Sequence, residues 1–252
     1  MERFYLGSHQ ANWLATVAVP LCVSRRRLAG RKTLPRAAAP WLLDSGGFSE
    51  LSLHGAWTVA VPEYAAQARR YAAEVGSLDL AAPMDWMCEP AVLARTGRTV
   101  AQHQLLTTAN YLDLLQAAPE LPWFPVLQGW ERDDYLRHAD IYEAAGVDLD
   151  ALPLVGVGTV CRRQHTGEAV SILTALAVRG YQLHGFGLKA QGLARAAGLL
   201  SSADSMAWSF TARRLRYPWC GSTKHINCAN CPAYATHWRA RLLAGLPATA
   251  AR

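Results

Sequence analysis

Short apolar runs alternate with amphipathic stretches along most of the chain. The apolar runs end in a polar residue or a glycine, as buried strands do where they enter a turn. The amphipathic stretches repeat their apolar positions every three to four residues, which indicates helices with one buried face. This pattern predicts strands at 3–7, 17–23, 42–48, 78–84, 123–127, 154–157, 182–186 and 202–209, and helices at 62–74, 100–117, 133–145, 169–179 and 193–200.

The alternation of strand and helix predicts an α/β fold with a parallel sheet and helical crossovers. The number of strand–helix repeats and the length of 252 residues favour a closed (β/α)8 barrel of the TIM type over an open sheet. No Gly-x-Gly-x-x-Gly motif opens a helix after the first strand, so a dinucleotide site has no support. We predict a single barrel domain over 1–245, which includes a metal-binding segment at 220–237, and a flexible tail at 246–252.

Polar residues follow several of the predicted strands. In a barrel these carboxyl ends converge on one face, so Asp44, Asp85, Gln128, Gly158 and Asp204 are expected there. Converging carboxylates suit nucleophilic and acid/base work at a glycosidic bond, although each Asp alone is equally typical of a helix cap. The Gln128 amide has both a donor and an acceptor for the edge of a heterocycle, or it is simply a satisfied buried side chain. Trp86, Met87 and Met206 are candidates to sandwich a base, or they fill the core.

A cluster of metal-binding residue types lies near the C-terminus. Cys220, His225, Cys228 and Cys231 have spacing typical of a tetrahedral, structural Zn²⁺ site. His237 is the competing fourth ligand. A redox Cys-x-x-Cys is the alternative, but it lacks the strand context of thioredoxin-like motifs.

The formal net charge is +6, which favours a polyanionic partner such as nucleic acid. Two basic runs are candidates for contacts with the nucleic-acid backbone, although solvated charge is the alternative for each: Arg25, Arg26 and Arg27, and Arg213 and Arg214 with Arg216. No apolar run reaches the roughly 20 residues of a membrane span. The first residues lack the apolar core of a signal peptide, so we expect a cytoplasmic protein.

Several motifs together resemble the queuine-type tRNA-guanine transglycosylases, and among them most of all the DNA-modifying deazaguanine branch (DpdA) of phages and bacteria. The segments that carry the resemblance are Asp44-Ser-Gly-Gly-Phe48, Pro83-Met-Asp-Trp-Met-Cys-Glu-Pro90, Val126-Leu-Gln-Gly129, Val155-Gly-Val-Gly-Thr-Val160, Ala203-Asp-Ser-Met-Ala207 and the late Cys/His cluster.

The resemblance implies roles for these residues. Asp204 corresponds to the nucleophile and Asp44 to the general acid/base. The residues implied to contact the base are Asp85, Gln128, Gly129, Gly158, Ser45 and Met206. The late cluster corresponds to the structural zinc site of the family.

The resemblance also implies the reaction, which is exchange of guanine in a nucleic acid for a free 7-deazaguanine such as preQ0 or preQ1. Ser49 and Trp130 depart from the tRNA enzymes, the zinc ligands are more closely spaced, and there is little room for an accessory RNA-binding domain. These departures favour DNA over tRNA as the substrate. The alternatives are the same reaction on tRNA and a non-catalytic zinc-containing protein that binds nucleic acid. A homodimer or a partner protein is possible from the resemblance, but no sequence feature indicates the surface.

Overall fold

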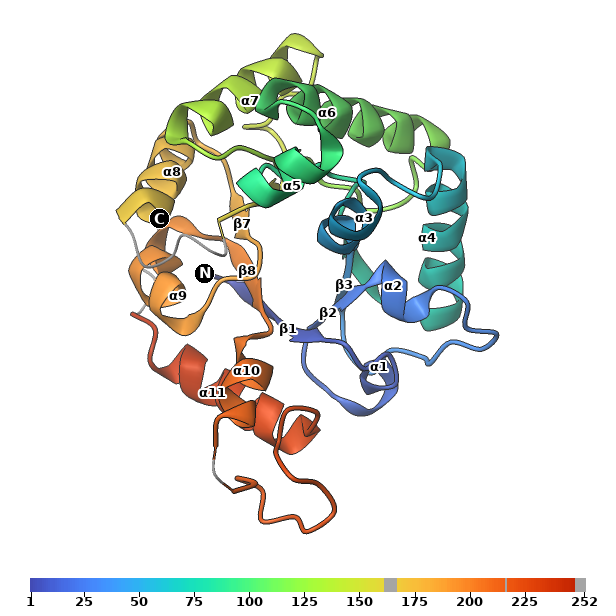
Figure 1. Ribbon diagram of the computed structural model, residues 1–252, viewed down its shortest axis with the longest axis vertical. Helices are drawn as coiled ribbons and strands as arrows, with labels where there is room; N and C mark the ends of the chain where they lie inside the picture. Colours follow the sequence, from blue (N-terminus) through green and yellow to red (C-terminus); the bar gives the residue numbers. More distant parts are fainter. Residues whose placement is uncertain (161–166, 216, 248–252) are drawn as a thin grey trace.

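The computed structural model describes residues 1–160, 167–215 and 217–247 (Figure 1). Within these residues, eight parallel strands form one sheet in the order β4-β3-β2-β1-β8-β7-β6-β5. The strands are β1 (Arg3–Ser8), β2 (Leu21–Ser24), β3 (Trp41–Asp44), β4 (Leu78–Ala81), β5 (Val126–Leu127), β6 (Val155–Val157), β7 (Leu183–Gly185) and β8 (Ser202–Ser205).

The two edges of this sheet meet, so that the strands enclose a barrel. β1 pairs with both β2 and β8, and β4 contacts the chain just before β5 through a parallel bridge between Ala81 and Trp123. The Ala81 amide also donates to the Pro122 carbonyl at 2.9 Å. The predicted α/β barrel is therefore confirmed.

Helices surround the strands (Figure 1). Those that match a predicted helix are α4 (Val61–Val75), α6 (Val100–Ala117), α7 (Arg132–Ala144), α8 (Gly167–Val178) and α9 (Ala190–Ala196), the last followed by the short 3-10 helix η1 (Ala197–Leu199). The others are α1 (Trp13–Thr16), α2 (Arg25–Leu28), α3 (Gly47–His54), α5 (Pro90–Thr96), α10 (Ala207–Arg213) and α11 (Pro232–Ala244). Local chemistry fixes some of these limits: α6 begins at a capping box in which Thr99 and Gln102 bond each other's backbone.

Several predicted strands are shorter in the structure. The strand expected at 17–23 begins only after Pro20, and the one expected at 123–127 begins after Pro125. Proline has no N–H to give to a sheet ladder, which explains both late starts. The strands expected at 42–48 and 202–209 stop at Asp44 and Ser205, because the chain then turns into α3 and α10.

Apolar side chains fill the barrel interior below the carboxyl ends of the strands. This inner cluster is separate from the larger core between strands and helices, and it comprises Tyr5, Cys22, Leu42, Ala82, Phe124, Val126 and Leu154. The interior is thus a packed core, as in other barrels, and polar chemistry is left to the rim.

The C-terminal segment packs back on the start of the chain. Arg239 on α11 donates to the Phe4 carbonyl at 3.1 Å, and Leu246 packs against the core. The flexible tail at 246–252 stays a prediction: Leu246 has apolar contacts with the core, and 248–252 lies outside the described residues. No helix in the described part of the chain is long and apolar enough to cross a membrane.

Candidate active site

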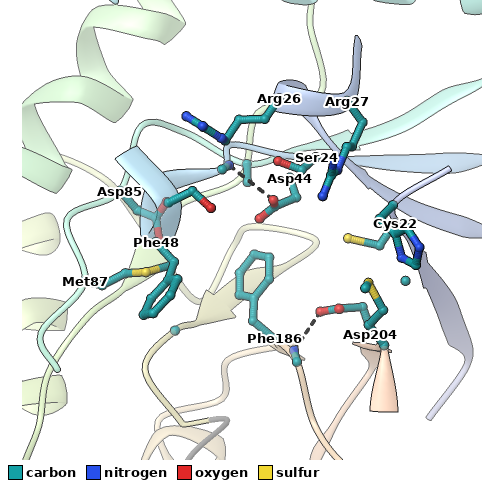
Figure 2. Close-up of a pocket in the computed structure, with 18 of the residues that line it drawn as sticks. Cys22, Ser24, Arg26, Arg27, Asp44, Phe48, Asp85, Met87, Phe186 and Asp204 are labelled. Atoms are coloured by element: carbon teal, nitrogen blue, oxygen red, sulfur yellow. Dashed lines mark hydrogen bonds between the residues drawn. The ribbon is translucent and has the colours of Figure 1, made fainter. Parts of the chain in front are cut away.

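A cavity of about 600 Å³ opens at the carboxyl ends of the strands. Asp44, Asp85 and Asp204 border it from three different strand ends, as the sequence predicts (Figure 2). The lining also contains Gly7, Ser8, His9, Cys22, Ser24, Arg26, Arg27, Gly46, Phe48, Ser49, Ala82, Met87, Glu89, Gly158, Thr159, Phe186, Gly187 and Met206. A volume of this size is typical of sites for small organic ligands.

Asp44 ends β3, and the two glycines after it allow the chain to turn beside it. Gly46 has a φ of 80°, and a Cβ there would approach Ser24 Oγ to 2.9 Å. A Cβ on Gly47 would approach the Asp85 carbonyl oxygen to 2.9 Å. Both positions therefore require glycine, which explains the Ser-Gly-Gly sequence in physical terms.

The surroundings of Asp44 favour its protonated form. Burial, and then the negative charges of Asp85 and Asp204, raise the pKa of Asp44 to about 7, although hydrogen bonds from Ser24 and the Gly46 amide favour the ionised form. A carboxyl group with this pKa can both give and take a proton near neutral pH, which suits a general acid/base.

Asp85 is held by side chains from neighbouring strand ends. Ser45 Oγ donates to Asp85 Oδ1 at 2.7 Å, and Gln128 Nε2 donates to Asp85 Oδ2 at 2.6 Å. Thr159 Oγ1 in turn donates to Gln128 Oε1 at 2.6 Å. Burial raises the pKa of Asp85, and the two donors oppose that effect. The network fixes the carboxylate at the cavity wall.

Asp204 lies on β8 and receives a backbone donor from the chain after β7. The Gly187 amide donates to Asp204 Oδ1 at 2.9 Å (Figure 2). The side chain of Asp204 is 11% exposed, and it borders the cavity. A largely buried carboxylate that a backbone N–H orients, and that still reaches open space, has the geometry of a nucleophile.

A family model for DpdA, DeoxyPurine in DNA protein A, matches residues 1–251 of this chain. The chain belongs to the DpdA family. No curated protein matches it. The match covers the barrel, the three aspartates and the C-terminal cluster, and membership of the DpdA family implies DNA as the substrate class.

Three of the residues predicted to bind the base do not border the cavity. Gln128 is fully buried behind Asp85, and both ends of its amide bond other side chains. Ser45 is also buried, and it acts on Asp85. Gly129 faces α7, where a Cβ would lie 2.7 Å from Asp134 Cβ. In this structure these three residues support Asp85 and the local fold, and their direct contact with a base stays an untested prediction.

Gly158 and Met206 border the cavity, and their contact with a base stays a prediction. A Cβ on Gly158 would lie 2.2 Å from Gln128 Nε2, so this glycine makes room for the amide that holds Asp85. Met206 is 41% exposed, and Met87 also lines the cavity, whereas Trp86 packs in a small core with Leu51 and Val92.

Sequence reasoning missed several residues at this site. Phe48 and Phe186 present aromatic rings to the cavity (Figure 2). Thr159 has a φ of 57°, which is rare for a β-branched residue and is typical of strained positions at functional sites. The position of Phe48, directly after the Ser-Gly-Gly turn, was the available signal for its role. No sequence signal pointed to Thr159, because the strain of its backbone leaves no pattern in the sequence.

The two basic runs are placed differently. Arg26 and Arg27 are exposed and line the cavity (Figure 2). Arg25 points the other way, is buried, and bonds Glu50 Oε1 at 2.6 Å, with Arg26 bonding the same oxygen at 2.7 Å. The buried ion pair places the Arg25 guanidinium away from the cavity, and its contact with the nucleic-acid backbone stays an untested prediction.

The second basic run lies at the end of α10. Arg213 and Arg214 are exposed, and the Arg214 guanidinium lies 3.9 Å from the centroid of the Phe210 ring. They stay candidates for nucleic-acid contact, and Arg216 lies outside the described residues.

The four predicted metal ligands come together. The ligand atoms of Cys220, His225, Cys228 and Cys231 all lie within 4.8 Å of one another, and Cys220 Sγ is 3.2 Å from His225 Nε2. Three sulfurs and one imidazole at these separations could hold a tetrahedral metal ion. His237, the alternative ligand, instead stacks on Trp219 with ring centroids 4.2 Å apart.

Proposed function

We propose that this protein exchanges guanine in DNA for a free 7-deazaguanine such as preQ0 or preQ1, through a covalent bond between Asp204 and deoxyribose. The observation that carries the proposal is the placement of Asp44 and Asp204 on the wall of one cavity in a chain of the DpdA family. Their surroundings differ in the way that an acid/base and a nucleophile require.

The first half of the proposed reaction removes guanine. A carboxylate oxygen of Asp204 attacks C1′, and the bond from C1′ to guanine N9 breaks with its electron pair passing to the base. The Asp44 carboxyl group supplies the proton that neutralises the departing guanine. A pKa of about 7 means that a large fraction of Asp44 carries this proton near neutral pH.

The second half installs the new base in the same cavity. N9 of the incoming 7-deazaguanine attacks C1′, its ring proton passes to the Asp44 carboxylate, and the ester bond breaks with its electrons returning to Asp204. Two displacements at C1′ retain its configuration, as in retaining glycosidases. Asp44 ends protonated and Asp204 ionised, so the enzyme is restored.

Base selection in this proposal belongs to residues that line the cavity. Asp85 is the hydrogen-bonding group, because Ser45 and Gln128 fix its orientation. Gly158 allows close approach of the backbone, and Met206, Met87 and Phe48 provide apolar and aromatic surface for the ring faces. A target inside a duplex would have to be flipped out, at a cost of a few kcal/mol.

The donor set of the C-terminal cluster fits Zn²⁺, because three thiolates and one imidazole are typical of structural zinc sites. Four protein ligands close the coordination shell, so the ion has no open position for substrate. Its role in this proposal is to fold the segment between α10 and α11.

The decisive experiment is incorporation of labelled preQ0 or labelled guanine into duplex DNA, single-stranded DNA and tRNA offered side by side. We expect label in DNA, and loss of at least about a thousandfold of the rate in Asp204→Asn, because the amide is a poor nucleophile. DNA binding and thermal stability serve as controls for the variant. Label in tRNA alone would overturn the substrate, and undiminished exchange by Asp204→Asn would remove Asp204 from its role.

A further inference from the structure

His184 lies beside Asp204 on the inner side of the barrel, and no motif pointed to it. It is on β7 and fully buried. Its Nδ1 is 2.8 Å from Ser202 Oγ, and its Nε2 is 3.5 Å from Asp204 Oδ1. Among the described residues, Nε2 has no aligned hydrogen-bond partner. A buried ring nitrogen in that state is an exception that needs an explanation.

Three aromatic rings hold the imidazole in its orientation. Tyr5, Phe124 and Phe186 pack edge-on against it with ring centroids 6.0, 5.9 and 4.5 Å away. Tyr5 and Phe124 are buried and Phe186 lines the cavity, so the imidazole is packed by three rings with its Nε2 3.5 Å from Asp204 Oδ1. A separation of 3.5 Å is long for a hydrogen bond, but such contacts often shorten when substrate binds.

We propose that His184 is a positioning residue for the nucleophile, a role that rests on the proposed function. Its Nε2 lies 3.5 Å from Asp204 Oδ1, the oxygen that the Gly187 amide bonds at 2.9 Å, and in this role Nε2–H donates to Oδ1 when that contact shortens on substrate binding. The Ser202 hydroxyl lies 2.8 Å from Nδ1 and is able to donate to it, and the proposed arrangement uses that direction, with the ring proton on Nε2. With Oδ1 fixed by two donors, Oδ2 is presented to C1′.

The same contact acts on the second half of the reaction. Once Oδ2 has bonded C1′, Oδ1 is the carbonyl oxygen of the ester. As the ester bond breaks, negative charge returns to the carboxylate, and donors already aimed at Oδ1 stabilise it without rearrangement. His184 therefore promotes both capture of the sugar and its release, without touching the base.

The test compares variants that keep or remove the donor. His184→Phe removes it while keeping a planar ring, and we expect kcat to fall about 30- to 100-fold with little change in KM for DNA. His184→Gln keeps an N–H near the position of Nε2, so we expect it to restore activity to within about tenfold of the native protein. Ser202→Ala should have an intermediate effect, because Nδ1 loses the hydroxyl group that hydrogen-bonds it.

A matched control removes a hydroxyl group that contacts a different, fully buried histidine. Thr108 Oγ1 lies 3.2 Å from His138 Nε2, on helices outside the barrel, so Thr108→Val should change kcat by less than about twofold. The proposal is overturned if His184→Phe retains native kcat. It is also overturned if His184→Gln is as impaired as His184→Phe, since the residue would then be only structural.

A measurement that needs no enzyme activity separates this proposal from the proposed function. In protein labelled with ¹⁵N-histidine, NMR should show His184 with its proton on Nε2, and Asp204→Asn should shift that Nε2 resonance. The positioning role would be overturned if the proton were found on Nδ1 alone. It would also be overturned if the Nε2 resonance did not shift in Asp204→Asn. Failure of base exchange with this NMR signature intact would instead count against the proposed reaction.

Discussion

At the scale of single residues, two aspartates on one cavity lie in different surroundings. Asp44 lies in a setting where burial and neighbouring carboxylates disfavour its charge. Asp204 instead receives a backbone N–H and lies next to an imidazole nitrogen. Pairs of acidic groups whose surroundings differ in this way are how one fold assigns acid and nucleophile roles at neutral pH.

The raised pKa of Asp44 makes a prediction about stability. The folded-state pKa is about 7 and the model-peptide value is 3.8, so between these two pH values the folded chain holds a proton that the unfolded chain has lost. The free energy of unfolding therefore falls as pH rises through this window, and the loss is complete above about pH 7. Asp44→Asn should be no more stable than the native protein near pH 4, and more stable by about 1–3 kcal/mol near pH 8.

Urea unfolding at a series of pH values measures this difference. The same variant should lose base exchange, because the amide cannot transfer the proton. In the native protein, kcat/KM for DNA should fall as pH rises through about 7, where Asp44 loses the proton for guanine departure. A stability difference that does not change between pH 4 and pH 8 would contradict the raised pKa.

At the scale of elements, α2 divides its arginines between two tasks. Arg25 faces inward to Glu50, which is itself buried and also accepts from Thr58. This contact anchors the helix, so that Arg26 and Arg27 are presented at the edge of the cavity. One turn of helix thus places Arg25 in the buried ion pair, Arg26 in the same pair but partly exposed at the cavity, and Arg27 exposed at the cavity.

Replacing Arg26 and Arg27 together with Gln should weaken DNA binding. If each arginine neutralises one phosphate, the slope of log K against log[salt] should become shallower by up to about 1.8. Titration of fluorescent DNA at several salt concentrations gives this slope. The matched control is Arg69→Gln with Arg70→Gln, two exposed arginines on the outer helix α4, which should leave the slope unchanged. Equal slopes for both double variants would remove α2 from the interface.

At the scale of the whole molecule, the metal-ligand segment is tied to the barrel at several points. Ser209 on α10 donates to the Ala229 carbonyl at 2.9 Å. Asn230 contacts His9, which lines the cavity, and α11 bonds β1 through Arg239. Because α10 begins just after β8, which carries Asp204, the cluster supports the helix that directly follows the proposed nucleophile.

Removal of the metal should therefore loosen this side of the barrel. We expect a chelator, or Cys228→Ser, to release about one equivalent of zinc and to lower Tm by roughly 5–15 °C, with most helical signal retained. Elemental analysis and thermal unfolding measure the two effects. His237→Ala is the control, since this ring stacks on Trp219 outside the cluster, and it should keep its zinc. A native protein that contains no zinc and is nevertheless fully stable would contradict a metal site.

The sequence by itself determined the barrel, the strand ends at which the aspartates lie, and the cysteine cluster. These features can be predicted locally, because the period of apolar positions and the spacing of ligands involve residues that are close together in the sequence. The limits of α6 agree with the sequence prediction for the same reason. The roles of Asp44 and Asp204 stay predictions from the family resemblance.

Only the tertiary structure decided which polar groups meet. Gln128 bonds Asp85 instead of facing the cavity, and Arg25 turns inward to Glu50. His184 reaches Asp204 only because β7 and β8 are adjacent, with His184 in register with Ser202. Each of these contacts joins segments that strand pairing or helix packing brings together. The local sequence pattern therefore does not predict which partner a buried polar group will bond.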